Sequence, residues 1–361
     1  MRVTSNTTPR RYRFWHCQVG RRPTVRRRPG ATTIAEVAER ANVSQATVSR
    51  VMNGRFLGEE AIAERVRAVA TELAYSPNHL ARSLALGQTR AIAFVVPDLA
   101  NPTFQAMLSS LSKAAARSGY RVLVADSAES PGDEPLLVAE IRRRCDAVVL
   151  CAPRMSDEVL EELAGTLRPL VVINRRNDAV EAPSLSIDYR AGVRDLAQHL
   201  YDLGHRRLVF LGGPSGSVSN AHRLEALSDF EREHPEVSIE RMPVGATIED
   251  GLGAASAVRD SGATAALAFN DLVAIGLLNG LLALGLRVPD DISVTGFDDI
   301  PFARYTTPPL TTASVPHEEL GTQAWQRMAA LIEGGQPDSD VVFRPHIEVR
   351  TSTGAAPTTI R

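Results

Sequence analysis

Apolar residues recur at helical spacing in three short stretches near the front of the chain, and polar residues separate these stretches. The first follows Thr33, which has a glutamate three positions on and so forms the pattern of a capping box, and it breaks at Asn42. The second follows Ser44 and stops at Asn53, and the third runs from about Glu59 to Leu73. The pattern predicts a small all-α unit of three helices.

From Ala91 onward, short apolar runs alternate with helical segments. The runs are nearly continuous, as expected for strands of a parallel sheet that is buried on both faces. They read AIAFVVP, YRVLVAD, DAVVLC, PLVVIN, RLVFLG, TAALAF and DISVTGF. Seven or more such strands over about 270 residues predict a doubly wound α/β fold with two lobes and a cleft between them.

Residues 76–90 fit neither pattern. Pro77 blocks simple continuation of the preceding helix, and the segment NHLARSLAL can form two helical turns at most. A helix this short is marginal in water, so we expect a linker that folds only against a partner. The predicted organisation is therefore a tail (1–31), a helical unit (32–75), this linker, and a two-lobed unit (91–361).

Charge is distributed unevenly along the 361 residues. The net charge is −2, but residues 1–31 carry +9, residues 32–90 carry +1 and the remainder carries −12. A basic front on an acidic body indicates that only the front meets a polyanion. The arginine-rich tail is interpreted as disordered, either as a leader, as the product of an upstream translation start, or as an arm that contacts nucleic acid.

Composition narrows the class of protein further. No stretch approaches the roughly 20 apolar residues that a membrane-spanning helix needs. The three cysteines, Cys17, Cys145 and Cys151, form no CxxC pair, which argues against a disulfide framework or a zinc site and favours a reducing cytoplasm. We therefore expect no metal, no cofactor and no membrane partner.

The second predicted helix has the spacing of the recognition helix in a helix-turn-helix. Its outward residues are Gln45, Ala46, Thr47, Ser49 and Arg50. Glutamine can pair with adenine, arginine can pair with guanine, and a small methyl group can contact the methyl of thymine. The alternative interpretation is the solvated face of a small packing helix.

The run from Thr33 to about Arg90 closely resembles the head-piece of the lactose/galactose repressor family. The matching segments are TIAEVA (33–38), VS (43–44), TVSRV (47–51), Asn53, YSPN (75–78) and ARSL (81–84). The later chain matches at NP (101–102), GH (204–205), Arg223, ND (270–271), GLRVPDDISVTGFDD (285–299) and PPLTT (308–312). The resemblance covers roughly residues 32–355 and implies a cytoplasmic, nucleoid-associated transcriptional regulator that is not an enzyme.

The resemblance further implies a homodimer that places two recognition helices in successive major grooves of a near-palindromic operator. The linker would become a hinge helix on the operator, with Leu84 wedged into the minor groove. A position in a protein core is the alternative for Leu84. The expected DNA-binding residues are Thr33, Ser44, Gln45, Ala46, Thr47, Ser49, Arg50, Asn53, Asn78, His79, Ala81 and Leu84.

By the same resemblance, the two lobes are built like periplasmic sugar-binding proteins and hold a small-molecule effector, a sugar or sugar derivative, in their cleft. Arg223 could donate two hydrogen bonds to a hydroxyl pair or a carboxylate, and Asp298 could accept bonds from hydroxyls. An internal salt bridge is the alternative for both residues, and a core position is the alternative for Phe104. The expected effector-binding residues are Asn101, Phe104, Arg175, Asp188, Ser219, Arg223, Asn270 and Asp298, with Asn174 a further candidate.

One position departs from the sugar-binding relatives. They often place a large aromatic residue in the turn before the helix that here starts near Thr247, and this chain has Ala246 there. A stacking platform for a pyranose ring is therefore missing on that side. This puts a simple hexose in doubt and leaves a smaller sugar, a phosphorylated or acidic sugar, or a non-sugar as the effector. Repression and activation are both compatible with the sequence.

Enzyme motifs are incomplete in this chain. GLGAAS (251–256) nearly matches GxGxxG but does not follow a strand, GGPSGS lacks the GK[ST] of a P-loop, and HEEL at His317 has no second histidine. No Ser/His/Asp grouping has a nucleophile elbow. A solute-capturing protein without DNA function fits the two lobes equally well, but the helix-turn-helix and the missing secretory signal argue against it.

Overall fold

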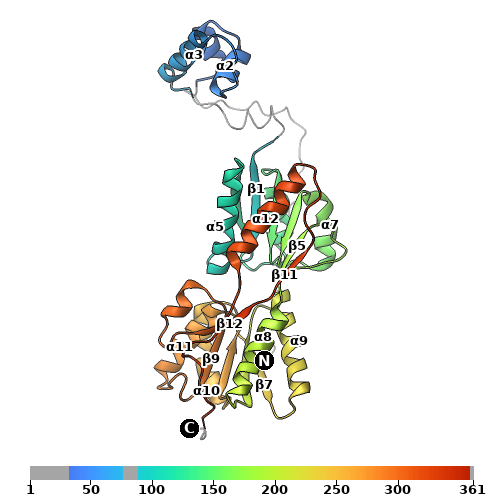
Figure 1. The fold of residues 1–361 in the computed structure, drawn as a ribbon, viewed down its shortest axis with the longest axis vertical. Coiled ribbons are helices and arrows are strands. Elements are labelled where there is room, and N and C mark those ends of the chain that lie inside the picture. The colour runs from blue at the N-terminus through green and yellow to red at the C-terminus, as the bar shows by residue number, and fades with distance from the viewer. Residues whose placement is uncertain (1–31, 76–87, 358–361) are drawn as a thin grey trace, which may run out of the picture. The chain divides into compact units, whose positions relative to one another are not determined.

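The computed structural model describes residues 32–75 and 88–357. They belong to two compact units, which lie within residues 1–82 and 83–361 (Figure 1). The predicted tail and most of the predicted hinge, with Asn78, His79, Ala81 and Leu84, lie outside the described residues. Within the described ranges, no helix is long and apolar enough to cross a membrane.

The first unit consists of three short helices, as the spacing of apolar residues predicts. They are α1 (Ile34–Ala41), α2 (Gln45–Met52) and α3 (Glu60–Glu72). Each helix buries one face in a shared apolar core, in which Val48 and Val66 are both fully buried. Burying a valine side chain contributes roughly 1.5–3 kcal/mol, so a few such residues hold this small unit together.

Side-chain caps fix where the first two helices begin. The Thr33 hydroxyl accepts a hydrogen bond from the Glu36 amide (3.3 Å), and the Glu36 carboxylate accepts one from the Thr33 amide (2.9 Å), which confirms the predicted capping box. The Ser44 hydroxyl accepts from the Thr47 amide (3.1 Å) at the start of α2. Asn42 ends α1 in the left-handed conformation (φ 50°), which makes the turn between the helices tight.

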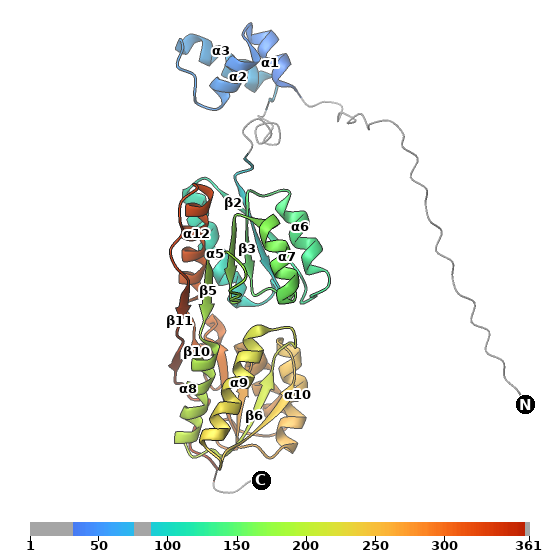
Figure 2. The same cartoon turned by 90° about the vertical axis from the view of Figure 1, so that its right-hand side faces the viewer.

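The second unit contains two lobes, and each lobe is a six-stranded sheet with helices on both faces (Figure 2). The strands of lobe 1 are β1 (Ala91–Val96), β2 (Arg121–Asp126), β3 (Ala147–Cys151), β4 (Leu170–Ile173), β5 (Ser184–Ile187) and β11 (Val341–Phe343). They are all parallel, in the order β11-β5-β4-β3-β1-β2. The helices are α5 (Pro102–Arg117), α6 (Glu134–Arg142), α7 (Asp157–Leu167) and α12 (His317–Ile332). The α5–α12 pair and the α6–α7 pair cover opposite faces of the sheet (Figure 2).

Lobe 2 repeats this plan. Its strands are β6 (Arg207–Gly212), β7 (Ser238–Pro243), β8 (Ala265–Ala268), β9 (Ser293–Asp298), β10 (Thr311–Ser314) and β12 (His346–Glu348). Their order is β12-β10-β9-β8-β6-β7, and only the β10–β12 pair is antiparallel. The helices are α8 (Tyr189–Asp202), α9 (Val218–Glu233), α10 (Ile248–Asp260) and α11 (Asp271–Ala283), with a 3-10 turn, η1 (Pro301–Tyr305). α8 packs with α9, and α10 packs with α11 (Figure 1).

The chain passes between the lobes three times, after β5, after β10 and after β11. Each crossing leaves the carboxyl end of a strand, so these ends of both sheets meet at the junction of the lobes, where open α/β sheets bind ligands. One apolar cluster contains residues of both lobes, including Phe94 and Met107 of lobe 1 and Phe210 and Phe297 of lobe 2.

All seven apolar runs form strands, which confirms the doubly wound α/β prediction. Five further strands, β5, β7, β10, β11 and β12, are not among those runs. Four of these five have only three or four residues, and β7 (SIERMP) mixes polar and apolar residues, because it lies at a sheet edge and is partly exposed to solvent. Such strands lack the continuous apolar run by which the buried ones are recognised.

Candidate DNA-recognition surface and sensor site

One face of α2 is presented to solvent while the opposite face is buried. Gln45, Ala46 and Arg50 are exposed, whereas Val48 and Val51 lie in the core of the helical unit. Thr47 and Ser49 are half-buried at the edge between the two faces. The predicted base-reading residues therefore share a single face of one helix.

Hydrogen bonds hold the side chains at both ends of α2. The Ser44 and Thr47 hydroxyls lie 2.9 Å apart at its start. At its end, Asn53 Nδ2 donates to the Ser49 carbonyl oxygen (2.7 Å). These contacts order the polar groups before any partner arrives, so less conformational entropy is lost on binding.

Strained backbone is concentrated where strands end at the junction of the lobes. Residues after β2, β3 and β4 and at the end of β9 have positive φ angles, including Ala152 (48°), Asn174 (58°) and Asp298 (108°). Left-handed backbone costs a non-glycine residue about 1–2 kcal/mol, and such strain clusters at functional sites. The junction has the backbone signature of a binding site.

Arg223 of α9 is 2% exposed, and its guanidinium lies among aromatic rings. Its Cζ atom lies 4.4 Å from the ring centre of Tyr189, 4.7 Å from that of Phe269 and 4.1 Å from that of Phe297. Nη1 donates to the Ser219 carbonyl oxygen (3.0 Å). Burial lowers the pKa of Arg223 to about 10, so the guanidinium is charged at neutral pH.

Two buried carboxyl groups belong to lobe 2, and one of them, Asp298, lies near this arginine. Burial raises the pKa of Asp298 from 3.8 to about 7, although the positive charge of Arg223 acts in the opposite direction. Burial, and next the charge of Asp298, raise the pKa of Asp271 well above its usual value. The Asp271 carboxylate accepts bonds from the Ile300 amide (2.8 Å) and the Thr312 hydroxyl (2.6 Å). Asp271 thus holds lobe 2 together, whereas Asp298 lies at the end of β9 beside Arg223.

Five buried polar atoms on the segments that meet at the junction have no hydrogen-bond partner within the described residues. They are Thr103 Oγ1, Asn174 Oδ1, Ser186 Oγ, Arg223 Nε and His317 Nδ1. A sixth, Arg327 Nε, belongs to the middle of α12. Leaving a buried polar atom without a partner costs about 1–3 kcal/mol, and native proteins keep few of them. Their gathering on strand ends and helix starts of both lobes is the pattern expected of a site that a polar ligand completes.

The tautomer of His317 follows from its partner. Its Nε2 lies 3.0 Å from the Asp298 carbonyl oxygen, which can only accept a hydrogen bond, so Nε2 carries the proton. Burial lowers the pKa of His317 to about 4, and the ring is neutral at pH 7. Nδ1 is then a bare acceptor that is left for a donor such as a hydroxyl group.

Four of the predicted effector-binding residues lie at helix starts beside the junction. Asn101, Asp188 and Asn270 each accept a 2.9 Å hydrogen bond from the first turn of α5, α8 and α11 respectively. Asn270 also donates to the Ala246 carbonyl oxygen (3.0 Å). The turn at Ala246, which lacks an aromatic residue, is therefore held to Asn270 through its backbone. The Ser219 hydroxyl lies 2.9 Å from that of a neighbouring serine, which caps α9. These caps aim helix amino termini at the junction.

Phe104 and Arg175 have contacts that favour structural roles. Phe104 is 7% exposed and belongs to the apolar cluster that contains residues of both lobes. Both Nε and Nη2 of Arg175 donate to Asp157 Oδ1 (3.1 and 2.7 Å), and Nη1 donates to the Pro153 carbonyl oxygen (3.0 Å). The core alternative weighed for Phe104 agrees with this burial.

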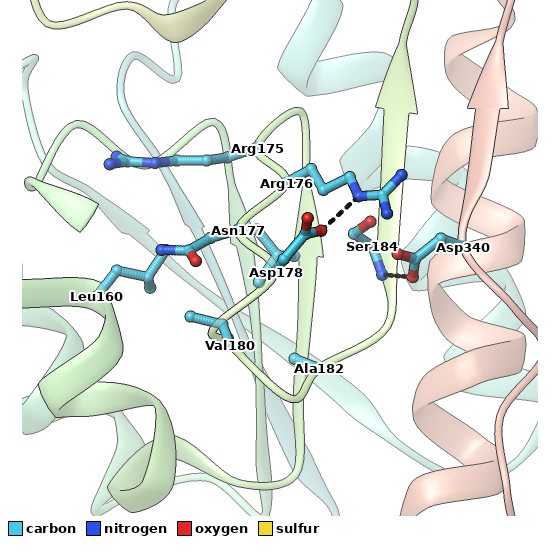
Figure 3. A pocket seen from close by; sticks show the side chains of 10 residues that line it. Leu160, Arg175, Arg176, Asn177, Asp178, Val180, Ala182, Ser184 and Asp340 are labelled. Carbon is cyan, nitrogen blue, oxygen red and sulfur yellow. Dashed lines mark hydrogen bonds and ion pairs between the residues drawn. The ribbon is translucent and has the colours of Figure 1, made fainter. Parts of the chain in front are cut away.

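A surface pocket lies beside Arg175, among residues of α7, β4 and β5 (Figure 3). On its rim, Arg176 Nε donates to Asp178 (2.9 Å), and the Ser184 amide donates to Asp340 (2.8 Å). Figure 3 shows Arg175 pointing away from the Arg176–Asp178 pair. These rim groups already have partners within the protein, in contrast to the polar atoms at the junction.

Three of the unpartnered residues are absent from the predicted sensor set. Thr103 lies in PDLANPTF, a segment that follows the first strand of lobe 1, and Ser186 lies two residues before the predicted Asp188. His317 carries only an incomplete zinc motif in the sequence. Position beside a strand end was the available signal for the first two, and nothing in the sequence singles out the third.

The described residues hold no group of three or more His, Cys, Asp or Glu side chains arranged for a metal ion. Cys145 and Cys151 are buried free thiols, and burial raises the pKa of Cys145 to about 11. Neither thiol is in the reactive thiolate form at neutral pH.

Two family models match the chain. Residues 33–78 match bacterial regulatory proteins of the lacI family, and residues 197–353 match a periplasmic binding protein-like domain. An uncharacterized HTH-type transcriptional regulator of Streptomyces limosus is 32% identical over 90% of this chain and 95% of its own length. The HTH-type transcriptional repressor CytR of Escherichia coli K12 is 30% identical over 91% and 98%. These relatives are regulators rather than enzymes.

Solved structures agree with this similarity. A lac repressor dimer bound to operator and the anti-inducer ONPF is 27% identical, with a TM-score of 0.79 over 90% of this chain and 100% of that one. A complex of the transcriptional regulator CelR with cellobiose is 26% identical, with a TM-score of 0.65 over 89% and 99%.

Proposed function

The chain belongs to the lacI family of bacterial regulatory proteins, and we propose that a small polar ligand bound between its lobes sets its affinity for an operator. It is a DNA-binding transcriptional regulator with a helix-turn-helix and a periplasmic-binding-protein-like domain. The alternative of a solute-capturing protein without DNA function has no support among its relatives. We assign the protein to the cytoplasm, where its DNA is, and we assign it no catalytic activity.

The exposed face of α2 supports specific contacts with bases in the major groove. Gln45 and Arg50 carry the hydrogen-bonding groups that distinguish adenine and guanine, and Ala46 is small enough to admit a thymine methyl. Ser44 and Thr47 lie at the amino end of the helix, where hydroxyls and amides can hold phosphates, and the Ser49 hydroxyl further along the helix is assigned the same role. Thr33 and Asn53 are assigned the same positioning role.

Residues 76–90 are assigned to the hinge, with Leu84 as the residue that enters the minor groove beside Asn78, His79 and Ala81. This assignment rests on the match of YSPN and ARSL to the family pattern. The domain boundaries at 31, 75 and 90 are proposed on the same basis.

A homodimer is supported by apolar side chains that the single chain leaves in solvent. On the packed helices α10 and α11, Leu252 is 49% exposed and Leu282 is 69% exposed. On the edge strand β2, Leu123 is 40% exposed and Val124 is 38% exposed. A second copy would cover these patches and would present two recognition helices to a near-palindromic operator.

The observation that carries the effector proposal is the set of unpartnered polar atoms at the junction. Arg223 Nε offers a donor, whereas Asn174 Oδ1 and His317 Nδ1 offer acceptors. A ligand that satisfies them must carry both acceptors and hydroxyl-like donors, as a sugar or sugar derivative does. With Ala246 in place of a ring, stacking contributes no affinity on that side, and the weight of these polar contacts favours a small or anionic sugar.

The ligand and the operator act on one protein and are therefore linked. Ligand contacts from both lobes stabilise one arrangement of the lobes, and the operator stabilises one arrangement of the hinge. If these are the same conformational state, each ligand raises the affinity for the other, and if they are different states, each lowers it by the same factor.

A thermal-shift screen of sugars, sugar phosphates and nucleobases tests the effector proposal. A ligand present at 100 times its Kd stabilises the folded protein by about 2.7 kcal/mol, so the effector stands out from inert compounds. Each ligand found is then added to an operator gel shift. A tight ligand that leaves operator affinity unchanged contradicts control by that site.

A further inference from the structure

Four exposed arginines gather at one end of lobe 1. They are Arg117 in the last turn of α5, Arg121 at the start of β2, and Arg143 and Arg144 after α6. Within residues 32–75 and 88–357, none of the four side chains forms an ion pair. We call these four residues the basic end.

Backbone hydrogen bonds place the basic end where the linker enters lobe 1. The Arg121 amide donates to the Arg90 carbonyl oxygen (2.9 Å), and the Asp146 amide donates to the Ala91 carbonyl oxygen (2.7 Å). The first residues of β1, β2 and β3 therefore lie side by side, opposite to the junction with lobe 2. The chain that leads back to the helix-turn-helix leaves from this same end.

Asp146, close in sequence to Arg143 and Arg144, forms no ion pair with any of the four arginines within the described residues. Asp146 accepts hydrogen bonds from the backbone amides of Thr89 (2.7 Å) and Arg90 (2.9 Å), and it thereby fastens the start of β1. In lobe 2, by contrast, exposed arginines such as Arg190 and Arg194 pair with glutamates on the neighbouring helix. Lobe 2 also has exposed arginines without an ion pair, such as Arg207 and Arg304, but only at the basic end do four of them lie on neighbouring elements of the described residues.

The charge of the basic end is opposite in sign to the net charge of the whole two-lobed unit. Residues 91–361 carry a net charge of −12, which repels DNA at long range. Four unpaired positive charges at one end of such a body create a local positive field. A polyanion would approach this end and no acidic face of the sensor.

We propose that the basic end contacts the phosphate backbone of the DNA to which the helix-turn-helix is bound. This inference rests on the proposed operator binding and adds a second, sequence-independent contact made by the sensor itself. Only residues 76–87 separate the two described parts of the chain, and a segment of that length spans at most about 40 Å. Operator binding therefore brings the basic end close to the same duplex, and arginine is well suited to bind phosphate.

The test compares two triple variants of the full-length protein. R117Q/R143Q/R144Q removes three charges from the basic end, and R207Q/R232Q/R259Q removes three charges from exposed arginines of lobe 2. Both variants keep Arg121, which adjoins the exposed strand β2. Equal melting temperatures and equal oligomeric states show that both are folded, and Kd is measured between 50 and 200 mM salt. The probes are a duplex selected by the wild-type protein from a random library and a scrambled duplex of the same length.

The basic-end variant should lower the slope of log K against log salt by up to about 5 in the homodimer, because each of its six lost phosphate contacts, three on each protomer, contributes about 0.9. Its preference for the selected duplex over the scrambled one should stay at the wild-type ratio, since phosphates carry no sequence information. The lobe 2 variant should keep the wild-type slope. Equal slopes for the two variants would overturn the proposal. If the wild-type protein bound the selected and the scrambled duplex equally well, operator recognition would be overturned, and the comparison of slopes would still test the basic end.

Discussion

The recognition helix and the junction of the lobes prepare for binding in opposite ways. On α2 the polar groups are exposed, held by caps and surrounded by water. At the junction the polar groups are buried, and five of them lack any hydrogen-bond partner within the described residues. Water satisfies the first surface until DNA displaces it, whereas at the second a matching ligand gains affinity by supplying hydrogen bonds to groups that the chain leaves without partners.

This difference assigns a different physical source of affinity to each surface. Contacts to DNA phosphates are made in high dielectric and are screened by salt. A ligand at Arg223 meets a charge that is already desolvated, so each hydrogen bond is stronger and each mismatch costs more. One surface should be sensitive to ionic strength, and the other to the removal of single atoms.

The largest contrast is expected on raising salt from 50 to 200 mM. Operator affinity should fall about 1000-fold, as for proteins that contact six or more phosphates. Ligand affinity should change less than about threefold, because buried charges are little screened. Titrations of both partners over the same salt series measure the two slopes, and equal slopes would remove the distinction between the surfaces.

Arg223→Met should weaken the effector about 100-fold, since a charge-assisted contact in a desolvated site contributes roughly 2–3 kcal/mol. Methionine fills the space among the three rings, so the fold should persist. Isothermal titration calorimetry with the ligand found by thermal shift measures the Kd of both proteins.

Arg223→Lys is the matched control for that experiment. It keeps the positive charge but loses the planar fork, and it should restore only part of the affinity. Wild-type ligand affinity in Arg223→Met, or an equal loss of operator affinity, would place Arg223 in the framework of lobe 2 rather than in the site.

Arg50→Ala should reduce the preference for operator over scrambled DNA about tenfold or more, because a bidentate contact to guanine discriminates by about 1–3 kcal/mol. Arg40→Ala removes the same charge from the same unit, where Arg40 pairs with Glu72 (2.5 Å), and should leave the ratio unchanged. Competition binding with the two duplexes gives both ratios. Parallel losses for the two variants would reduce Arg50 to a general electrostatic contact.

A smaller effect should appear in the pH dependence of stability. Burial raises the pKa of Asp298 from 3.8 to about 7, so between these values the native state holds a proton that the unfolded chain has released. The free energy of unfolding therefore falls as pH rises through this window. Relative to Asp298→Asn, the wild-type value should fall by up to about 1 kcal/mol more per pH unit.

His317 acts in the other direction, since burial lowers its pKa to about 4, but it is present in both proteins and its contribution cancels in the difference. Denaturant melts between pH 4 and pH 8 supply the curves. Parallel curves for the wild type and Asp298→Asn would mean that the Asp298 carboxyl is ionised throughout.

Sequence patterns predicted α2 and its surroundings almost completely. Helix starts are encoded locally, because Thr33 and Ser44 cap helices through residues only three positions away. The exposed face follows from helical periodicity once Val48 and Val51 are assigned to the core. Nothing in this unit needs long-range information to be recognised.

The junction was only partly predictable. Strand ends marked Asn101, Asn270 and Asp298, and the family pattern marked Arg223. Ser186 also lies beside a strand end but was not selected, and His317 carried no comparable signal. Whether a buried atom has a partner depends on segments far apart in the chain, as in the contact between His317 and Asp298. The ion pair between Arg175 and Asp157 could not be predicted for the same reason.

The central claim is that the junction and the operator are linked through one conformational equilibrium. It is tested most directly by measuring the operator Kd with and without a saturating concentration of the ligand found by thermal shift, in the wild type and in Arg223→Met. We predict a change of about 5- to 150-fold in the wild type, and none in Arg223→Met at the same ligand concentration. An unchanged operator Kd in the wild type, with the ligand bound, would contradict the account.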